Sequence, residues 1–204
     1  MLKRVALLVA LMVALPLTAF AGQIDFTNSG GLLTGSSSGL SLSNSTLIAV
    51  NGLSGGGLVA GVDLGTFNFS TGALASGSLQ NGGTFAGGGS VLIVGNGING
   101  VTAGTIFSGS FSGPVQWTLT TLATGTHNYI LTGAISGTLG KSTPAFGATV
   151  QLTINTGKGW FNGKVKGSSG DTNISSVTPE PGTLLLFGTG LMSVAAVLRR
   201  RFIG

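Results

Sequence analysis

The chain has 204 residues, of which 38 are glycine and none is cysteine, and its formal net charge is +5. The absence of cysteine excludes disulfides and an N-terminal lipid anchor on cysteine. One histidine and four acidic residues leave few groups for acid–base or metal chemistry, so the composition argues against most hydrolases and transferases.

The positive charge is concentrated at the two ends of the chain. Two basic residues precede residue 5 and three follow residue 198. The middle holds four lysines, Lys141, Lys158, Lys164 and Lys166, and four acidic residues, Asp25, Asp63, Asp171 and Glu180. The middle is therefore close to neutral, and we expect no nucleic-acid partner because phosphate binding needs a basic surface.

Residues 1–21 have the pattern of a secretory signal peptide. Lys3 and Arg4 precede an apolar run from residue 5 to 17, and Ala19 and Ala21 supply small residues at the spacing that a signal peptidase requires. The apolar run is short for a bilayer span of about 20 residues. We predict export and cleavage after Ala21.

Residues 22–166 are rich in glycine, serine and threonine and predict an all-β domain. Between residues 23 and 57 the turn signals leave room only for short strands, the best at 46–50. Apolar and polar residues alternate at 115–120 and 149–155, a third strand is expected at 128–136, and a turn at 155–159 leads into a strand at 160–166 that forms a hairpin with its predecessor. A mainly antiparallel β-sandwich or barrel-like domain is predicted. Loosely repeated Gly-Thr-Phe phrases near residues 65, 83 and 104 keep a β-solenoid as the alternative.

The C-terminal part begins with a polar stretch, 167–178, which is predicted to be a flexible linker. Pro179, Glu180 and Pro181 follow, and two prolines around one acid favour an extended, accessible segment. Residues 182–198 are uncharged and mostly apolar and predict a short transmembrane helix. The basic cluster after it, Arg199, Arg200 and Arg201, is expected on the cytoplasmic side, so the β domain would lie outside.

Pro-Glu-Pro, a short apolar helix and a terminal arginine cluster together resemble the PEP-CTERM sorting tail of exported proteins in Gram-negative bacteria. The resemblance covers residues 178–204, and Thr178 stands where the family commonly has valine. It implies that Pro179, Glu180 and Pro181 are recognised by an exosortase-type processing enzyme, which removes the tail. It also implies attachment to the inner membrane before processing, then location at the cell surface or outside, and exopolysaccharide as a candidate partner.

The sequence offers no catalytic or metal site and implies no cofactor. A hydrolase would require at least two of Asp25, Asp63, Asp171 and His127 to meet in one cleft, and His127 is expected in an exposed turn. Residues 35–39 match the spacing of a nucleophile elbow and residues 95–100 a dinucleotide fingerprint, but glycine is so frequent here that both matches are attributed to composition.

Aromatic residues carry one binding hypothesis, because sugar rings stack on exposed aromatic faces. Trp117 lies on the apolar side of its strand with Val115 and Leu119 and is expected in the core, together with five phenylalanines at 67, 69, 85, 107 and 111. Trp160 and Tyr129 are the candidates for sugar stacking. We therefore expect a non-enzymatic, exported surface or matrix protein associated with biofilm or exopolysaccharide; a carbohydrate-binding module is the alternative, and a hydrolase ranks third.

Overall fold

The computed structural model describes residues 23–141 and 143–175. The predicted signal peptide with Ala19 and Ala21, the sorting residues Pro179, Glu180 and Pro181, the span 182–198 and the cluster Arg199, Arg200 and Arg201 lie outside the described residues. No helix within the described ranges has the length and apolar character to cross a membrane.

The described part of the chain is all-β, and its one helical segment is a 3-10 turn at Leu53–Gly55. The strands, in chain order, are β1 (Gln23–Ser36), β2 (Gly39–Asn51), β3 (Val59–Ser70), β4 (Leu74–Ser78), β5 (Gly82–Phe85), β6 (Gly88–Gly95), β7 (Gly104–Phe111), β8 (Val115–Thr121), β9 (His127–Leu139), β10 (Thr143–Asn155) and β11 (Lys164–Ser175).

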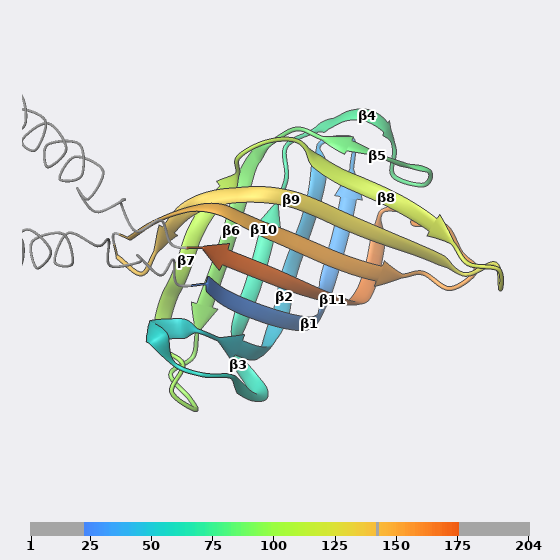
Figure 1. The fold of residues 1–204 in the computed structure, drawn as a ribbon. Helices are drawn as coiled ribbons and strands as arrows, with labels where there is room; N and C mark the ends of the chain where they lie inside the picture. Colours follow the sequence, from blue (N-terminus) through green and yellow to red (C-terminus); the bar gives the residue numbers. More distant parts are fainter. Residues whose placement is uncertain (1–22, 142, 176–204) are drawn as a thin grey trace, which may run out of the picture. The chain divides into compact units, whose positions relative to one another are not determined.

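Eight of these strands close into an antiparallel barrel. The order of hydrogen-bonded neighbours is β1-β2-β3-β6-β7-β9-β10-β11, and β11 pairs back onto β1, with Gln23 opposite Ser175 and Thr34 opposite Lys164. Apart from two insertions, β4–β5 and β8, strands that are neighbours in the barrel also follow one another along the chain. This connectivity defines an up-and-down barrel. Figure 1 shows β9, β10, β11 and β1 crossing in front of β2, β3, β6 and β7. Closure leaves the eight barrel strands paired on both sides.

Because neighbouring strands alternate in direction, the barrel has two distinct ends. The terminal end carries Gln23, Ser175 and the β2–β3, β6–β7 and β9–β10 connections. The opposite end carries the β1–β2 turn, the β10–β11 loop and both insertions. One insertion is the β4–β5 hairpin, which we call the flap, and the other is β8, which pairs with the first part of β9 on one side and with β5 on the other. We call this the flap end (Figure 1).

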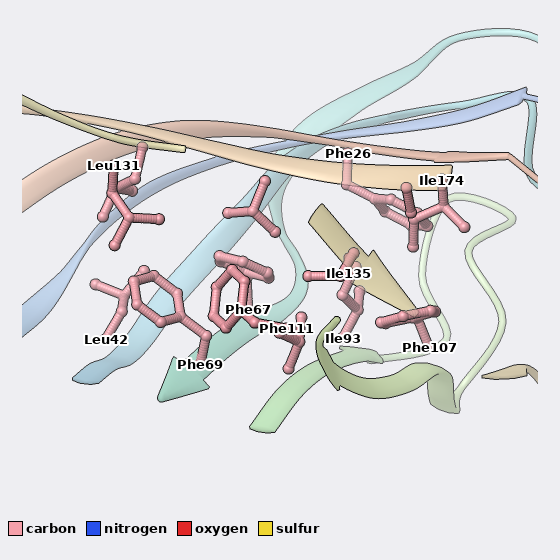
Figure 2. Packing of buried hydrophobic residues seen from close by; sticks show 14 of the residues in the cluster. Phe26, Leu42, Phe67, Phe69, Ile93, Phe107, Phe111, Leu131, Ile135 and Ile174 are labelled. Atoms are coloured by element: carbon pink, nitrogen blue, oxygen red, sulfur yellow. The ribbon is translucent and has the colours of Figure 1, made fainter. Parts of the chain in front are cut away.

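Side chains fill the barrel interior. Along β9, alternate residues from His127 to Ile135 are buried while most of their neighbours are half-buried or exposed, as expected for strands with one face turned inward. Figure 2 shows Phe26, Phe67, Ile93 and Phe107 among the packed side chains that arise from opposite walls. Trp117 and the phenylalanines at 67, 69, 85, 107 and 111 are buried, which confirms their predicted place in the core.

A close approach of backbones explains one glycine pair. Gly109 on β7 faces Gly137 on β9, and a Cβ on either residue would collide with the backbone carbonyl of Ser136 or Ser108 and with the ring of Phe107. Because both positions are glycine, β7 and β9 can lie close together here and the ring of Phe107 can pack against them.

The structure selects the barrel and contradicts the solenoid. The Gly-Thr-Phe phrases fall on β3, β5 and β7, of which β3 and β7 are barrel strands and β5 belongs to the flap. Their partners differ, since β3 pairs with β2 and β6, whereas β5 pairs with β4 and β8. These phrases are therefore not equivalent repeats.

Two predictions about strand extent were wrong. Only short strands were predicted between residues 23 and 57, but this segment forms the two long strands β1 and β2. The strands continue through irregular positions, such as the register shift at Thr27/Asn28 and the positive-φ residues Gly30 and Gly31. The predicted linker from residue 167 also proved to be strand: β11 runs to Ser175 and pairs with both β1 and β10. The predicted hairpin of the last two strands is confirmed, although β11 begins at Lys164 rather than at residue 160.

Candidate functional site

Three aromatic side chains pack together beneath the flap. Trp117 on β8 stacks on Tyr129 on β9, with ring centroids 4.9 Å apart and an interplanar angle of 15°. Phe161 from the β10–β11 loop meets Trp117 edge-on at 5.4 Å and lies 6.0 Å from Tyr129. All three are at most 1% exposed, so they seal this end of the barrel core.

The polar atoms of this group tie the flap to the barrel. Trp117 Nε1 donates to the carbonyl of Leu79 at 2.8 Å, and Tyr129 OH donates to the carbonyl of Gln80 at 2.7 Å. The same Tyr129 oxygen accepts the N–H of Phe161 at 3.1 Å. Tyr129 is fully buried, and the prediction that it stacks on a sugar was wrong: its alternation along β9 turns the ring inward, where its hydroxyl joins the flap turn to the β10–β11 loop.

Trp160 lies on the surface at the same end and is 50% exposed. Its indole stacks on the imidazole of His127, with ring centroids 4.1 Å apart and an interplanar angle of 25°. His127 is the first residue of β9, is only 7% exposed, and its Nδ1 lies 3.0 Å from Thr121 Oγ1. The expectation of an exposed turn histidine was wrong, because pairing with Thr121 on β8 and the cover of Trp160 bury the ring.

The loop that bears Trp160 is held by hydrogen bonds at several points. His127 N–H donates to the carbonyl of Gly157 at 2.7 Å, and Thr156 N–H donates to the carbonyl of His127 at 3.1 Å. Thr156 Oγ1 also donates to the carbonyl of Gly159 at 2.6 Å. The aromatic face of Trp160 that His127 does not cover is therefore presented to solvent in a fixed orientation.

The candidate catalytic residues are distributed over the barrel. Asp25 and Asp171 lie on the outer face of β1 and β11, where Asn173 Nδ2 donates to Asp25 at 2.6 Å and Thr27 Oγ1 donates to Asp171 at 2.8 Å. A groove of about 230 Å³ beside them is lined by Asp171 but not by Asp25. Asp63 lies on β3 and His127 at the flap end. Within the described ranges, no three His, Asp or Glu side chains are grouped so that they could hold a metal ion.

The two motif matches fall in connections between strands. Residues 35–39 span the end of β1, the turn at 37–38 and the first residue of β2, so Ser37 is followed by a strand and not by the helix that a nucleophile elbow requires. Residues 95–100 lead from β6 toward β7, so the fingerprint is followed by a strand instead of a phosphate-binding helix. Neither position has the local structure that gives its motif chemical meaning.

A pocket of about 370 Å³ lies at the terminal end. Its walls come from β1, the β2–β3 and β6–β7 connections, and the facing ends of β7, β9 and β10, with Ile24, Leu53, Ile106 and Leu139 as apolar lining and Thr102, Thr105 and Thr143 as hydroxyl groups. None of the described residues that line it is charged. The pocket can shelter an apolar group but offers no group for acid–base chemistry.

Comparison with known proteins identifies the tail. Residues 177–201 match the family model of the PEP-CTERM protein-sorting motif. The chain therefore carries a PEP-CTERM sorting motif, which marks it as an exported protein that an exosortase sorts. No curated protein and no solved structure matches the chain.

Sequence reasoning found Trp160 but missed the His127–Trp160 stack and the hydrogen bonds of Tyr129. The two members of the stack are separated by 33 positions and meet only because β8, β9 and the β10–β11 loop converge at the flap end. The alternation of apolar residues at Tyr129, Leu131 and Ile135 was the signal that could have placed Tyr129 in the core.

Proposed function

We propose that the protein acts outside the cell as a non-enzymatic component of the surface or extracellular matrix, in association with exopolysaccharide. The observation that carries the proposal is the PEP-CTERM motif at residues 177–201, attached to a closed, all-β domain. Such a domain suits an environment outside the cytoplasm because its strands are paired around a filled core and need no disulfide for closure.

The route begins with secretion and removal of residues 1–21 after Ala21. Residues 182–198 then hold the protein in the inner membrane, with Arg199, Arg200 and Arg201 in the cytoplasm and the barrel in the periplasm. An exosortase-type enzyme recognises Pro179, Glu180 and Pro181 and removes the tail. The barrel is released to the cell surface or beyond.

The absence of enzymatic activity is part of the proposal, and the surface chemistry of the barrel supports it. Asp25 and Asp171 each accept a hydrogen bond from a neighbouring strand, and only Asp171 lines the adjacent groove. His127 lies at the flap end and stacks on Trp160. A hydrolase of the two-carboxylate type would need its acids to face one substrate across one cleft.

The test compares the natural protein with a variant in which Glu180→Ala is combined with Pro179→Ala and Pro181→Ala. Mass spectrometry of the natural protein from its host should give an N-terminus at Gly22 and a C-terminus near residues 179–182. The triple variant should retain its full tail and stay in the inner-membrane fraction. Thr183→Ala, outside the triplet, is the matched control and should be processed normally. An intact tail on the natural protein at the cell surface would contradict the proposal.

Carbohydrate binding is the second candidate function. With Tyr129 buried, it depends on Trp160, whose exposure and fixed orientation favour it. The two candidate functions, matrix component and carbohydrate binding, are compatible, since binding to a polysaccharide would retain an exported protein in the matrix.

A further inference from the structure

We propose that the flap end is a binding site for an acidic polysaccharide, with Trp160 as the stacking platform and nearby lysines as the partners of the sugar carboxylates. The proposal deepens the proposed function, because it rests on export to a place where polysaccharide is present.

The first observation is the geometry of Trp160. Its indole is half exposed, and His127 covers one face at a centroid distance of 4.1 Å. The other face is therefore open to solvent as a flat apolar surface, which fits the face of a pyranose ring where C–H groups are exposed. An aromatic ring with one covered and one open face supplies contact area at low entropic cost, because its orientation is set before the ligand arrives.

The second observation is the support beneath this ring. The side chain of His127 is only 7% exposed. A hydrogen bond of 3.0 Å between its Nδ1 and Thr121 Oγ1 fixes the orientation of the imidazole ring. The loop of Trp160 is fastened to the start of β9 through Gly157 and Thr156. The hydroxyl groups of exposed Thr124 and half-buried Thr126, 3.0 Å from each other, lie in the β8–β9 turn beside this loop and can exchange hydrogen bonds with sugar hydroxyls.

The third observation is the distribution of charge between the two ends. Lys158 lies two residues before Trp160, and Lys164 and Lys166 begin β11, so three of the four described lysines lie at or near the flap end. All three are exposed. Asp25, Asp63 and Asp171 lie in the halves of β1, β3 and β11 that are toward the terminal end, where Lys141 is the remaining lysine. A stacking face on a basic end favours an anionic ligand over a neutral one.

An acidic polysaccharide fits these observations better than single-stranded nucleic acid, which also combines planar rings with negative charge. Nucleic-acid grooves place several aromatic side chains along a strongly basic track. Here one exposed tryptophan and three lysines are available on a barrel whose described residues carry four lysines and three aspartates. Export also places the protein where polysaccharide is the expected polymer.

The experiment uses the full-length protein and three probes: polygalacturonate as the acidic polysaccharide, dextran as a neutral one, and oligo(dT). Binding is measured by the change in tryptophan fluorescence and by retardation in gels that contain each polymer. We expect binding to polygalacturonate that weakens with added salt, and little binding to dextran or oligo(dT). Trp160→Ala should weaken polygalacturonate binding by about fivefold or more. Lys158→Glu should weaken it by about threefold or more.

Matched variants separate the site from general effects. Leu58→Ala removes an exposed apolar side chain (69% exposed), and Lys141→Glu reverses a charge away from the flap end; both should bind as the natural protein does. Trp160→Phe keeps an aromatic face and should recover part of the affinity. Equal binding to dextran, tighter binding to oligo(dT), or an unchanged affinity in Trp160→Ala would overturn the proposal. If the natural protein is exported and loses its tail but does not bind polygalacturonate, this binding site is rejected and the proposed function stands. If the protein binds polygalacturonate but keeps its tail, the proposed function is rejected and the binding site stands.

Discussion

Replacing Tyr129 by phenylalanine tests how the flap is held. The substitution keeps the ring and its stacking on Trp117 but removes the hydroxyl, which donates to the carbonyl of Gln80 at 2.7 Å and accepts the N–H of Phe161 at 3.1 Å. The Phe161 N–H is then left unpaired in a buried place, while the carbonyl of the exposed Gln80 can turn to water. With about 1–3 kcal/mol for a buried unpaired group and about 1 kcal/mol for the second bond, we expect a loss of about 2–4 kcal/mol in the free energy of unfolding.

Urea denaturation, followed by the fluorescence of buried Trp117 and exposed Trp160, measures this loss. For a slope of about 2 kcal/mol per molar urea the midpoint should fall by about 1–2 M. Thr118→Val is the matched control, because it removes an exposed hydroxyl from the same sheet and should change stability by no more than about 0.5 kcal/mol. If Tyr129→Phe and Thr118→Val shift the midpoint equally, the hydroxyl does not hold the flap and the reasoning fails.

Two further substitutions test the barrel wall and its core. Gly109→Ala should destabilise the protein by about 1–3 kcal/mol or more, because the added methyl group meets the carbonyl of Ser136 and the ring of Phe107; Gly113→Ala, which has open space around it, should be nearly neutral in the same thermal melt. Phe107→Ala should cost about 3–5 kcal/mol by leaving a cavity in the core, and Val62→Ala, at an 87% exposed position, less than about 0.5 kcal/mol. Comparable melting temperatures for either pair would contradict the packing described here.

The strands that the sequence predicted well are those with regular alternation. β8, β9 and β10 were located because their apolar residues recur at every second position and point into one core. β1 and β2 were underestimated because Gly30, Gly31 and the bulge at Asn28 interrupt this period, and a pattern of period two cannot be followed across an extra residue. β11 was missed for a related reason: its glycines and serines are typical of a linker, and only pairing with β1 and β10 makes the segment a strand.

The proposed binding surface was also predicted only in part. Trp160 was recognised because it is an aromatic residue beside a turn, but its partner could not be inferred from the local sequence. His127 and Trp160 meet through the pairing of β8 with β9 and the return of the β10–β11 loop. Tyr129 has the same residue-type preference for surfaces as Trp160, and its place in the fold buries it.

The sequence by itself determined how this protein is addressed, because a sorting motif such as that at residues 177–201 is recognised from local composition and order. It also determined the all-β class, since alternation and turn residues act over a few positions. The closure of eight strands into a barrel, the burial of Tyr129 and the presentation of Trp160 were decided only by the tertiary structure. Each depends on which strands lie side by side, as when Gln23 pairs with Ser175 across 152 positions of the chain, and contacts at such separation are set by the packing of the whole core.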